Sequence, residues 1–438
     1  MKKLILALCL IGFSMIGTAQ KNTKFAKIDS LLTYFTENNK FMGSLSIMEN
    51  GEVLFDKAYG YSDVDKKIKA TTTTKYKIGS ITKMFTAVVA FQLVDEGKLR
   101  LETKLSRYYP KVPNADKITI GNLMNHRSGI FNFTDDAKFM QTNGTTITKE
   151  QMIADISSHP SIFEPNSKSE YSNSNYILLG YIIEDITKKN YAENIQERII
   201  SKLNLEHTQY YTTIDPSKNE AYSYNFENNK WVQYPEWNNT HVFAAGAIQS
   251  TPNDLNVFIQ ALFSGQLLKP KSFQEMIRLE DNYGKGILTF PFGERRFFGH
   301  NGGIEAFSSA LGYYPAEKLS FALTINGSNY NSNDIVLGIL STLYKMPYRF
   351  PNLKTVAVDK AILAKYSGVY STESFPLKIT IKEEKGVLVA QATGQSAFPL
   401  NAISTTEFVF DEAGIQLDFS QNTMTLKQGG MVYKLKKE

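Results

Sequence analysis

The spacing of apolar residues changes between helical and strand-like along the first hundred residues. Apolar side chains at 31–35 recur at helical spacing, and two alternating runs then flank Asn50-Gly51, a dipeptide typical of two-residue hairpin turns. A second helix is expected from Ser80 to Glu96, with Gly97 in the left-handed position that commonly follows a helix. Its apolar residues occupy most of the helix circumference, so we expect this helix to be central and buried.

The pattern is less regular from about residue 100 to 245, where loops are expected to dominate around one clear helix near 176–187. Thr251 followed by a proline and, at 254, an acid has the form of a helix start. Alternation returns at 307–311 and 321–325, which predicts two adjacent strands. Helices and strands are therefore mixed through most of the chain.

The pattern of apolar and polar residues changes after residue 346. Residues 347–362 contain two prolines and are expected to be a linker, and residues 363–438 carry only short alternating runs separated by glycine-containing turns. Evenly spaced short strands predict a small all-β barrel or sandwich domain. We therefore expect a large domain over residues 20–346, followed by this β domain.

The first residues have the form of a secretory leader. Lys2 and Lys3 precede an apolar stretch at 4–16 that is too short to span a bilayer, and small residues follow at 17–19. This pattern predicts a signal peptide over residues 1–19 and an exported protein, periplasmic or secreted. The one cysteine, Cys9, lies within the leader, so the mature chain is expected to have no disulfide and no cysteine chemistry.

Composition narrows the function classes. The 438 residues are 42% hydrophobic and 21% charged, as in ordinary globular proteins. The net charge of +5 is small and spread along the chain, which argues against nucleic-acid binding. The five histidines show no metal-ligand spacing, no phosphate-binding glycine loop is present, and no later segment is apolar enough to span a membrane. We expect no metal, no cofactor and no membrane span.

Ser80 and Lys83 are the first candidates for chemistry. On a helix, residues three apart lie on one face, so a serine with a lysine one turn later forms a possible nucleophile and base pair. A buried lysine can lose its proton near neutral pH. The alternative is that Ser80 only caps the helix and Lys83 is solvated. Lys83 falls on a helix with very little polar face, which favours the catalytic interpretation.

Two further segments could complete such a site. Tyr171 could relay a proton and Asn173 could hold a lysine or a substrate amide, although the pair could equally be a structural helix start. His300 and Asn301 precede Gly302 and Gly303, whose backbone could approach a ligand closely and bind an oxyanion. A plain glycine turn with a satisfied histidine is the alternative.

Taken together, Ser-x-x-Lys, Tyr-x-Asn and His-x-Gly before a strand stand in the order found in the serine β-lactamase and penicillin-binding-protein superfamily. The chain most resembles its class C-like branch, which includes D-Ala-D-Ala carboxypeptidases, D-aminopeptidases and esterases. The likeness covers roughly residues 40–344, and the segment after it resembles, more weakly, the small β-barrel domains appended to this branch. Further matching segments are 41–43, 59–63, 93–99, 123–130, 163–173, 245–246 and 299–309.

The resemblance implies an α+β fold, in which an antiparallel sheet is flanked by helices and a helical subdomain, with a small all-β domain after it. It also implies roles for the site residues. Ser80 would attack an acyl carbonyl, with Lys83 and Tyr171 sharing the general-base work. Asn173 would hold Lys83 and the substrate amide, and the backbone N–H groups of Ser80 and Gly303 would form the oxyanion hole.

Two positions depart from the pattern of true β-lactamases. His300 stands where they mostly carry lysine, and Asn301 replaces the hydroxyl residue that usually binds a substrate carboxylate. A largely neutral His300 lowers the positive potential expected of the site. Asn301 lowers the expected affinity for a substrate carboxylate. The leading hypothesis is an exported serine hydrolase acting on D-amino-acid peptides, such as a peptidoglycan stem peptide, in the manner of a D-Ala-D-Ala carboxypeptidase. The alternatives are a β-lactamase or esterase of the same mechanism, and a non-catalytic peptidoglycan- or peptide-binding protein.

Overall fold

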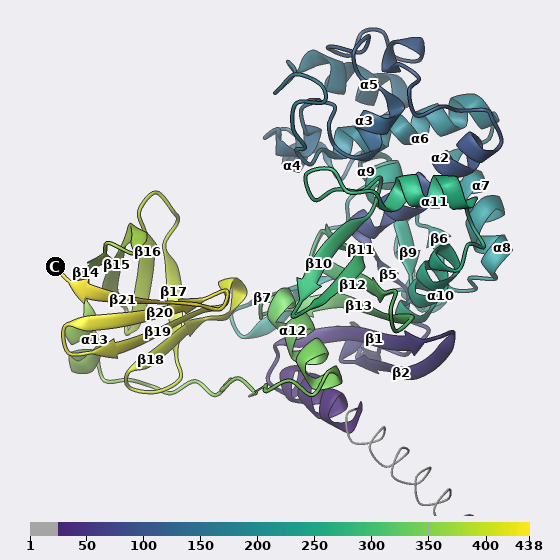
Figure 1. Cartoon of the computed structure of the whole chain (residues 1–438). Helices are drawn as coiled ribbons and strands as arrows, with labels where there is room; N and C mark the ends of the chain where they lie inside the picture. Colours follow the sequence, from purple (N-terminus) through teal and green to yellow (C-terminus); the bar gives the residue numbers. More distant parts are fainter. Residues whose placement is uncertain (1–24, 349) are drawn as a thin grey trace, which may run out of the picture. The chain divides into compact units, whose positions relative to one another are not determined.

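A computed structural model describes residues 25–348 and 350–438, so the expected signal peptide lies outside the described residues. The chain divides into two compact units (Figure 1). One is Met42–Gly327, and the other joins Ser328–Glu438 to the chain before Met42, where residues 25–37 form the expected first helix. Each unit is described by itself below.

An antiparallel sheet organises the larger unit. Its central path runs β10-β11-β12-β13-β1-β2, and β7 and β8 extend it beside β13. Asn50 and Gly51 both have positive φ, 52° and 82°, which confirms the expected hairpin between β1 and β2. The adjacent strands expected near 307 and 321 are β12 and β13. The strands are β1 (Phe41–Glu49), β2 (Glu52–Tyr59), β7 (Tyr224–Glu227), β8 (Lys230–Gln233), β10 (Leu288–Phe292), β11 (Arg295–Ile304), β12 (Phe307–Tyr314) and β13 (Leu319–Ser328).

Two small sheets accompany the main one. β3 (Tyr61–Asp63) pairs with β4 (Ile68–Lys69), and β9 (Ile248–Ser250) lies between β5 (Tyr76–Lys77) and β6 (Gln209–Tyr210). The three-stranded sheet holds the chain immediately before the serine of the Ser-x-x-Lys motif, because β5 ends three residues ahead of that serine.

The buried helix expected after Ser80 is present. Its first turn is the 3₁₀ segment η1 (Gly79–Ile81), and the α-helix α2 (Thr82–Asp95) continues it, with Gly97 at φ +74° as expected. Side chains around its whole circumference are buried, which agrees with the nearly continuous apolar pattern. Helices α6 (Asn173–Thr187) and α9 (Asn239–Gly246) pack against it.

More helix is present between residues 100 and 245 than the sequence suggested. Helix α5, for example, begins with a reciprocal capping box between Thr148 and Gln151. Helix α10 begins at Thr251, whose side chain accepts the N–H of Asp254, as expected. The remaining helices of this unit are α3 (Ile120–Met124), α4 (Phe139–Thr142), α5 (Lys149–Ser158), α7 (Tyr191–Ile195), α8 (Ser201–Leu203), α10 (Pro252–Phe263) and α11 (Pro270–Ile277), with a π-turn η4 (Gln196–Ile200) and 3₁₀ turns η2 (Leu105–Arg107), η3 (Phe133–Asp135) and η5 (Pro216–Lys218).

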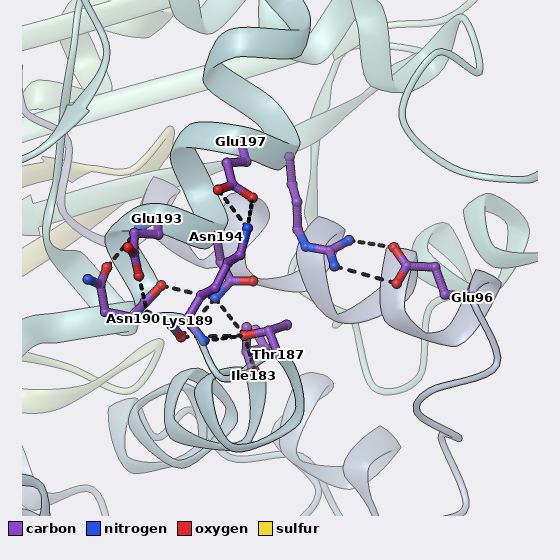
Figure 2. Close-up of polar contacts among 9 residues, drawn as sticks. Glu96, Ile183, Thr187, Lys189, Asn190, Glu193, Asn194 and Glu197 are labelled. Atoms are coloured by element: carbon purple, nitrogen blue, oxygen red, sulfur yellow. Dashed lines mark hydrogen bonds and ion pairs between the residues drawn. The ribbon is translucent and has the colours of Figure 1, made fainter.

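A polar junction fixes the far end of α2 (Figure 2). Arg198, in the π-turn, forms an ion pair of 2.5 Å with Glu96, the residue that follows α2, and this hydrogen bond lowers the pKa of Glu96 to about 2. Nearby, Asn190 and Glu193 cap the start of α7 reciprocally, and Lys189 pairs with Glu197. The helix that begins at the Ser-x-x-Lys motif is thereby anchored at its other end.

The second unit contains the expected small β domain, which is a closed barrel. Strands β14 to β21 pair in sequence order and β14 pairs with β21, so the barrel has no open edge. Buried aromatic and aliphatic side chains fill its interior. The strands are β14 (Gly368–Thr372), β15 (Phe375–Glu384), β16 (Val387–Ala392), β17 (Phe398–Ala402), β18 (Glu407–Phe410), β19 (Ile415–Ser420), β20 (Thr423–Gln428) and β21 (Met431–Lys437), with helices α12 (Ser332–Leu343) and α13 (Lys360–Tyr366) and the 3₁₀ turn η6 (Asp411–Ala413).

Among the described residues, no helix is both long and apolar enough to cross a membrane.

Candidate active site

Lys83 lies one helical turn after Ser80, and its side chain is enclosed. Its Nζ lies 3.0 Å from Ser80 Oγ, 2.8 Å from Asn173 Oδ1 and 2.9 Å from the carbonyl oxygen of Ala245. The Lys83 side chain is fully buried, and this burial lowers its pKa well below the usual value. The solvated alternative for Lys83 is therefore excluded.

Three oxygens surround the Lys83 amine, and each could accept one N–H of its protonated form. A neutral amine has two N–H donors and one lone pair. Asn173 Oδ1 and the Ala245 carbonyl can only accept hydrogen bonds, so in the neutral form they take both N–H groups. In that form the lone pair faces Ser80 Oγ and can accept the hydroxyl proton.

A break in helix α9 presents the Ala245 carbonyl to Lys83. Phe243 leaves the helical conformation at φ 30°, ψ −127°, and the two carbonyls that follow it face α2. Ala244 O accepts a hydrogen bond from Thr86 Oγ1, and Ala245 O accepts one from Lys83 Nζ. The carbonyl of Ala245 thus helps to hold the lysine amine in place.

Tyr171 also contacts Ser80. Its hydroxyl donates a hydrogen bond of 2.7 Å to Ser80 Oγ, and burial raises the pKa of the phenol above its usual value. The ring packs against that of His126, with 4.5 Å between centroids. Burial also holds the pKa of His126 well below its usual value, so this ring is a neutral support for Tyr171.

Asn173 occupies the first turn of α6, and each side of its amide has a defined partner. Its Oδ1 accepts from Lys83, and its Nδ2 donates to Thr134 Oγ1 at 3.1 Å. The backbone N–H of Asn173 donates to Asn132 Oδ1 at 2.9 Å. The orientation of the amide is therefore set by the chain itself, with one Nδ2 hydrogen left for a further acceptor.

The glycines of the third motif allow two backbones to meet. Gly79 has φ +51°, and a Cβ there would lie 2.8 Å from the Gly303 nitrogen. A Cβ on Gly302 would lie 2.0 Å from the carbonyl oxygen of Ile78, which also accepts a hydrogen bond from Ser309 Oγ. Glycine is required at 79 and 302 for β11 to lie directly against the turn that carries the serine.

His300 is buried on β11, and its ring lies 6.4 Å from that of Tyr171. Its Nδ1 is 2.5 Å from the carbonyl oxygen of Asn301, which can only accept, so Nδ1 carries the hydrogen. Burial lowers the pKa of His300 to about 3. His300 is therefore neutral at ordinary pH, and Asn301 is exposed beside it.

A cavity of about 260 Å³ opens beside Ser80. It brings together the serine, Asn173 and Gly303, three of the residues that the sequence singled out. None of the described residues that line it has an acidic or basic side chain. The other lining residues are Phe133, Thr134, Phe139, Met140, Trp237, Val242, Ala245, Gly246 and Ile304.

The structure therefore gathers the three sequence motifs into one place, with Lys83 and Tyr171 both in contact with the oxygen of Ser80. It adds partners that sequence reasoning missed, because the loops before α4 and α9 carry no recognisable signal. Thr134, Trp237 and the Ala245 carbonyl are of this kind, although Ala245-Gly246 was among the matching segments. No group of three potential metal-ligating side chains occurs in the part of the chain that the structure describes.

Comparisons with known proteins agree with this geometry. Residues 35–342 match the family model described as Beta-lactamase. The chain is 30% identical over 329 residues to Protein flp of Staphylococcus aureus, a match that covers 70% of this chain and 64% of that protein. It is 29% identical over 323 residues to the Teichoic acid D-alanine hydrolase of the same species, covering 70% of this chain and 76% of that one.

Among solved structures, the D-amino acid amidase from Ochrobactrum anthropi superposes with a TM-score of 0.65 at 26% sequence identity. The match covers 74% of this chain and 99% of the amidase. The match to Protein flp spans less than two thirds of that protein's length. The fold, the motif order and the family match together give one conclusion. The chain belongs to the β-lactamase family, and it is similar to proteins described as a teichoic acid D-alanine hydrolase and a D-amino acid amidase.

Proposed function

We propose that this chain is an exported hydrolase that cleaves amide or ester bonds of D-amino-acid substrates through an acyl-enzyme on Ser80, a class that includes the D-Ala-D-Ala carboxypeptidase-like action expected from the sequence. The observation that carries the proposal is the hydrogen-bond chain through the serine oxygen. Tyr171 donates to Ser80 Oγ at 2.7 Å, and the Lys83 amine lies 3.0 Å from the same oxygen.

In acylation, Ser80 Oγ attacks the substrate carbonyl carbon while its proton passes to Lys83 Nζ. The oxyanion that forms is stabilised by the backbone N–H groups of Ser80 and Gly303. The bond to the leaving group then breaks, and the Tyr171 hydroxyl protonates that group as it departs. Lys83 returns a proton to the phenolate, so the acyl-enzyme forms with Tyr171 and Lys83 in their starting states.

In deacylation, water attacks the ester carbonyl of the acyl-enzyme. The ester bond to Ser80 breaks, Ser80 Oγ recovers a proton, and the acid product leaves. In this mechanism the Tyr171 phenol, kept protonated by burial, is the acid and the neutral Lys83 amine is the base, and both contact the same oxygen. Two groups with pKa values moved in opposite directions suit this division of roles.

The preference for D-amino-acid substrates rests on the relatives. Two of these relatives are described as a teichoic acid D-alanine hydrolase and a D-amino acid amidase, names that place their action at D-amino acids. The uncharged cavity and the neutral His300 favour an esterase as the second candidate, since an ester needs no carboxylate recognition. They argue against efficient β-lactam hydrolysis for the same reason.

Steady-state turnover tests the proposal. The mature chain would be assayed with a D-Ala-D-Ala peptide, D-alanine amide, an activated ester and a penicillin, alongside Ser80→Ala and, as a matched control, the exposed Ser167→Ala. Turnover of a D-amino-acid substrate that Ser80→Ala abolishes and Ser167→Ala retains supports the proposal. Turnover of the ester alone supports the esterase, and unchanged ligand binding without any turnover indicates a binding protein.

A further inference from the structure

The cavity beside Ser80 is walled by large apolar side chains. Three are aromatic and three are aliphatic, and together they surround the space between α4, α9 and the end of β11. They are Phe133, Phe139, Trp237, Met140, Val242 and Ile304. From this lining we infer, resting on the proposed function, that the enzyme selects acyl groups with a bulky, uncharged, apolar side chain over small or charged ones.

The cavity lies on the acyl side of the scissile bond. Its lining includes Ser80, Asn173 and Gly303 but neither Tyr171 nor His300. In the proposed mechanism the leaving group departs toward the Tyr171 hydroxyl, which protonates it. The portion of the substrate that stays attached to Ser80 is therefore the portion that faces the apolar walls.

The aromatic residues that line the cavity pack against one another without a ligand. The ring of Phe139 packs edge-to-face against Phe133 on one side and Trp237 on the other, with centroid distances of 5.6 and 5.0 Å. Such mutual contacts restrict the rotamers of all three rings. A ligand side chain consequently meets a rigid surface and need not order it on binding.

A buried ion pair holds one of these walls. The backbone N–H of Trp237 donates to Glu305 Oε1 at 2.7 Å, and the same carboxylate oxygen lies 2.6 Å from the fully buried amine of Lys77. Lys77 also contacts Glu236, the residue before the tryptophan, at 3.2 Å. The aromatic wall is thereby tied to the segment that leads into Ser80.

The cavity lining also disfavours a charged side chain on the acyl group of the substrate. A charged acyl side chain would lose its hydration without gaining an ionic partner, because no acidic or basic residue lines the cavity. A D-alanyl group would leave most of the space unfilled. The lining therefore fits an aromatic or branched aliphatic D-amino-acid side chain.

Substrates that differ only in the acyl side chain test this inference. N-acetylated p-nitrophenyl esters of D-phenylalanine, D-leucine, D-alanine and D-glutamate share one leaving group. We expect kcat/KM to fall in that order, with a factor of at least about 10 between the phenylalanine and alanine esters. Trp237→Ala should remove most of that factor.

Introducing a positive charge at the cavity, and separately at an exposed position outside it, provides a matched pair of variants. Met140 is 57% exposed at the cavity, and Met431 is 56% exposed on the barrel, far from it in sequence. Met140→Lys should raise kcat/KM for the glutamate ester relative to the phenylalanine ester by about 10-fold, and Met431→Lys should not.

Ser80-dependent turnover that prefers the alanine or glutamate ester would overturn this inference and leave the proposed function standing. The same is true if Met140→Lys and Met431→Lys behave alike. Absence of Ser80-dependent turnover with every ester, with D-amino-acid amides and with D-peptides would contradict the proposed function itself.

Discussion

Replacing Lys83 by methionine tests whether the lysine amine is neutral in the folded enzyme. Methionine has a similar length and no charge, and it retains neither the base nor the two hydrogen bonds to Asn173 and Ala245. If Lys83 is the general base, the variant should lose about 10²- to 10⁴-fold in kcat/KM, the range typical of a positioned base.

The same variant gives a pH-dependent signature in stability. Burial lowers the pKa of Lys83 well below the 10.5 that it has when exposed, so between those two values the unfolded chain binds one proton more than the folded chain. The free energy of unfolding then rises with pH, by up to about 1.4 kcal/mol per pH unit. Lys83→Met lacks this contribution at every pH.

Urea unfolding at pH 7, 8 and 9 measures the difference. Both tryptophans, Trp231 and Trp237, lie in the Met42–Gly327 unit, so their fluorescence follows that unit. The lost hydrogen bonds to Asn173 and Ala245 give a constant offset. The stability of the wild type relative to Lys83→Met should therefore increase by up to about 2.7 kcal/mol from pH 7 to pH 9.

A stability difference that stays flat across this range would show that Lys83 remains protonated in the fold. The lone pair assigned to face Ser80 would then not exist, and the base would have to be another group. A variant at the exposed Lys98, Lys98→Met, controls for a general effect of removing a lysine.

Three further predictions follow from the site. Gly79→Ala should lower kcat by at least about 10²-fold, because its Cβ would displace the Gly303 nitrogen from the oxyanion hole; kinetics with an activated ester checks this. Glu305→Gln removes one partner of the buried Lys77 and should destabilise the fold by up to about 3–5 kcal/mol, as thermal unfolding would measure. His300→Gln should leave the shape of the kcat/KM profile between pH 5 and 8 unchanged, since a pKa of about 3 keeps His300 neutral throughout; a shifted inflection near pH 6.5 would contradict the neutral histidine.

Local signals in the sequence were sufficient for much of the fold. The Asn50-Gly51 turn, the Thr251 cap and the position of Gly97 depend only on neighbouring residues, and each is present as expected. The alternating runs after residue 363 likewise predicted short strands, although closure into a barrel depends on the pairing of β14 with β21. The region from 100 to 245 was harder, because α5 and its neighbours are short helices whose amphipathic signal is weak.

In the candidate site, too, features set by neighbouring residues could be predicted and features set by tertiary packing could not. Ser80 and Lys83 could be paired from helical geometry alone, and the enclosure of Lys83 followed from a helix without a polar face. The aromatic walls could not be predicted, because Phe139 and Trp237 meet only through tertiary packing of loops distant in sequence. The break at Phe243 that presents the Ala245 carbonyl likewise has no local sequence signal.

The central claim is that Ser80 forms a covalent acyl-enzyme, and intact-mass spectrometry tests it most directly. The mature chain and its Ser80→Ala variant would each be incubated with a penicillin, an activated ester and a D-Ala-D-Ala peptide. The account predicts an added mass equal to the acyl group, or a hydrolysed product, with the wild type and neither with Ser80→Ala. An adduct that survives the substitution, or no adduct and no product with any of the three compounds, would contradict it.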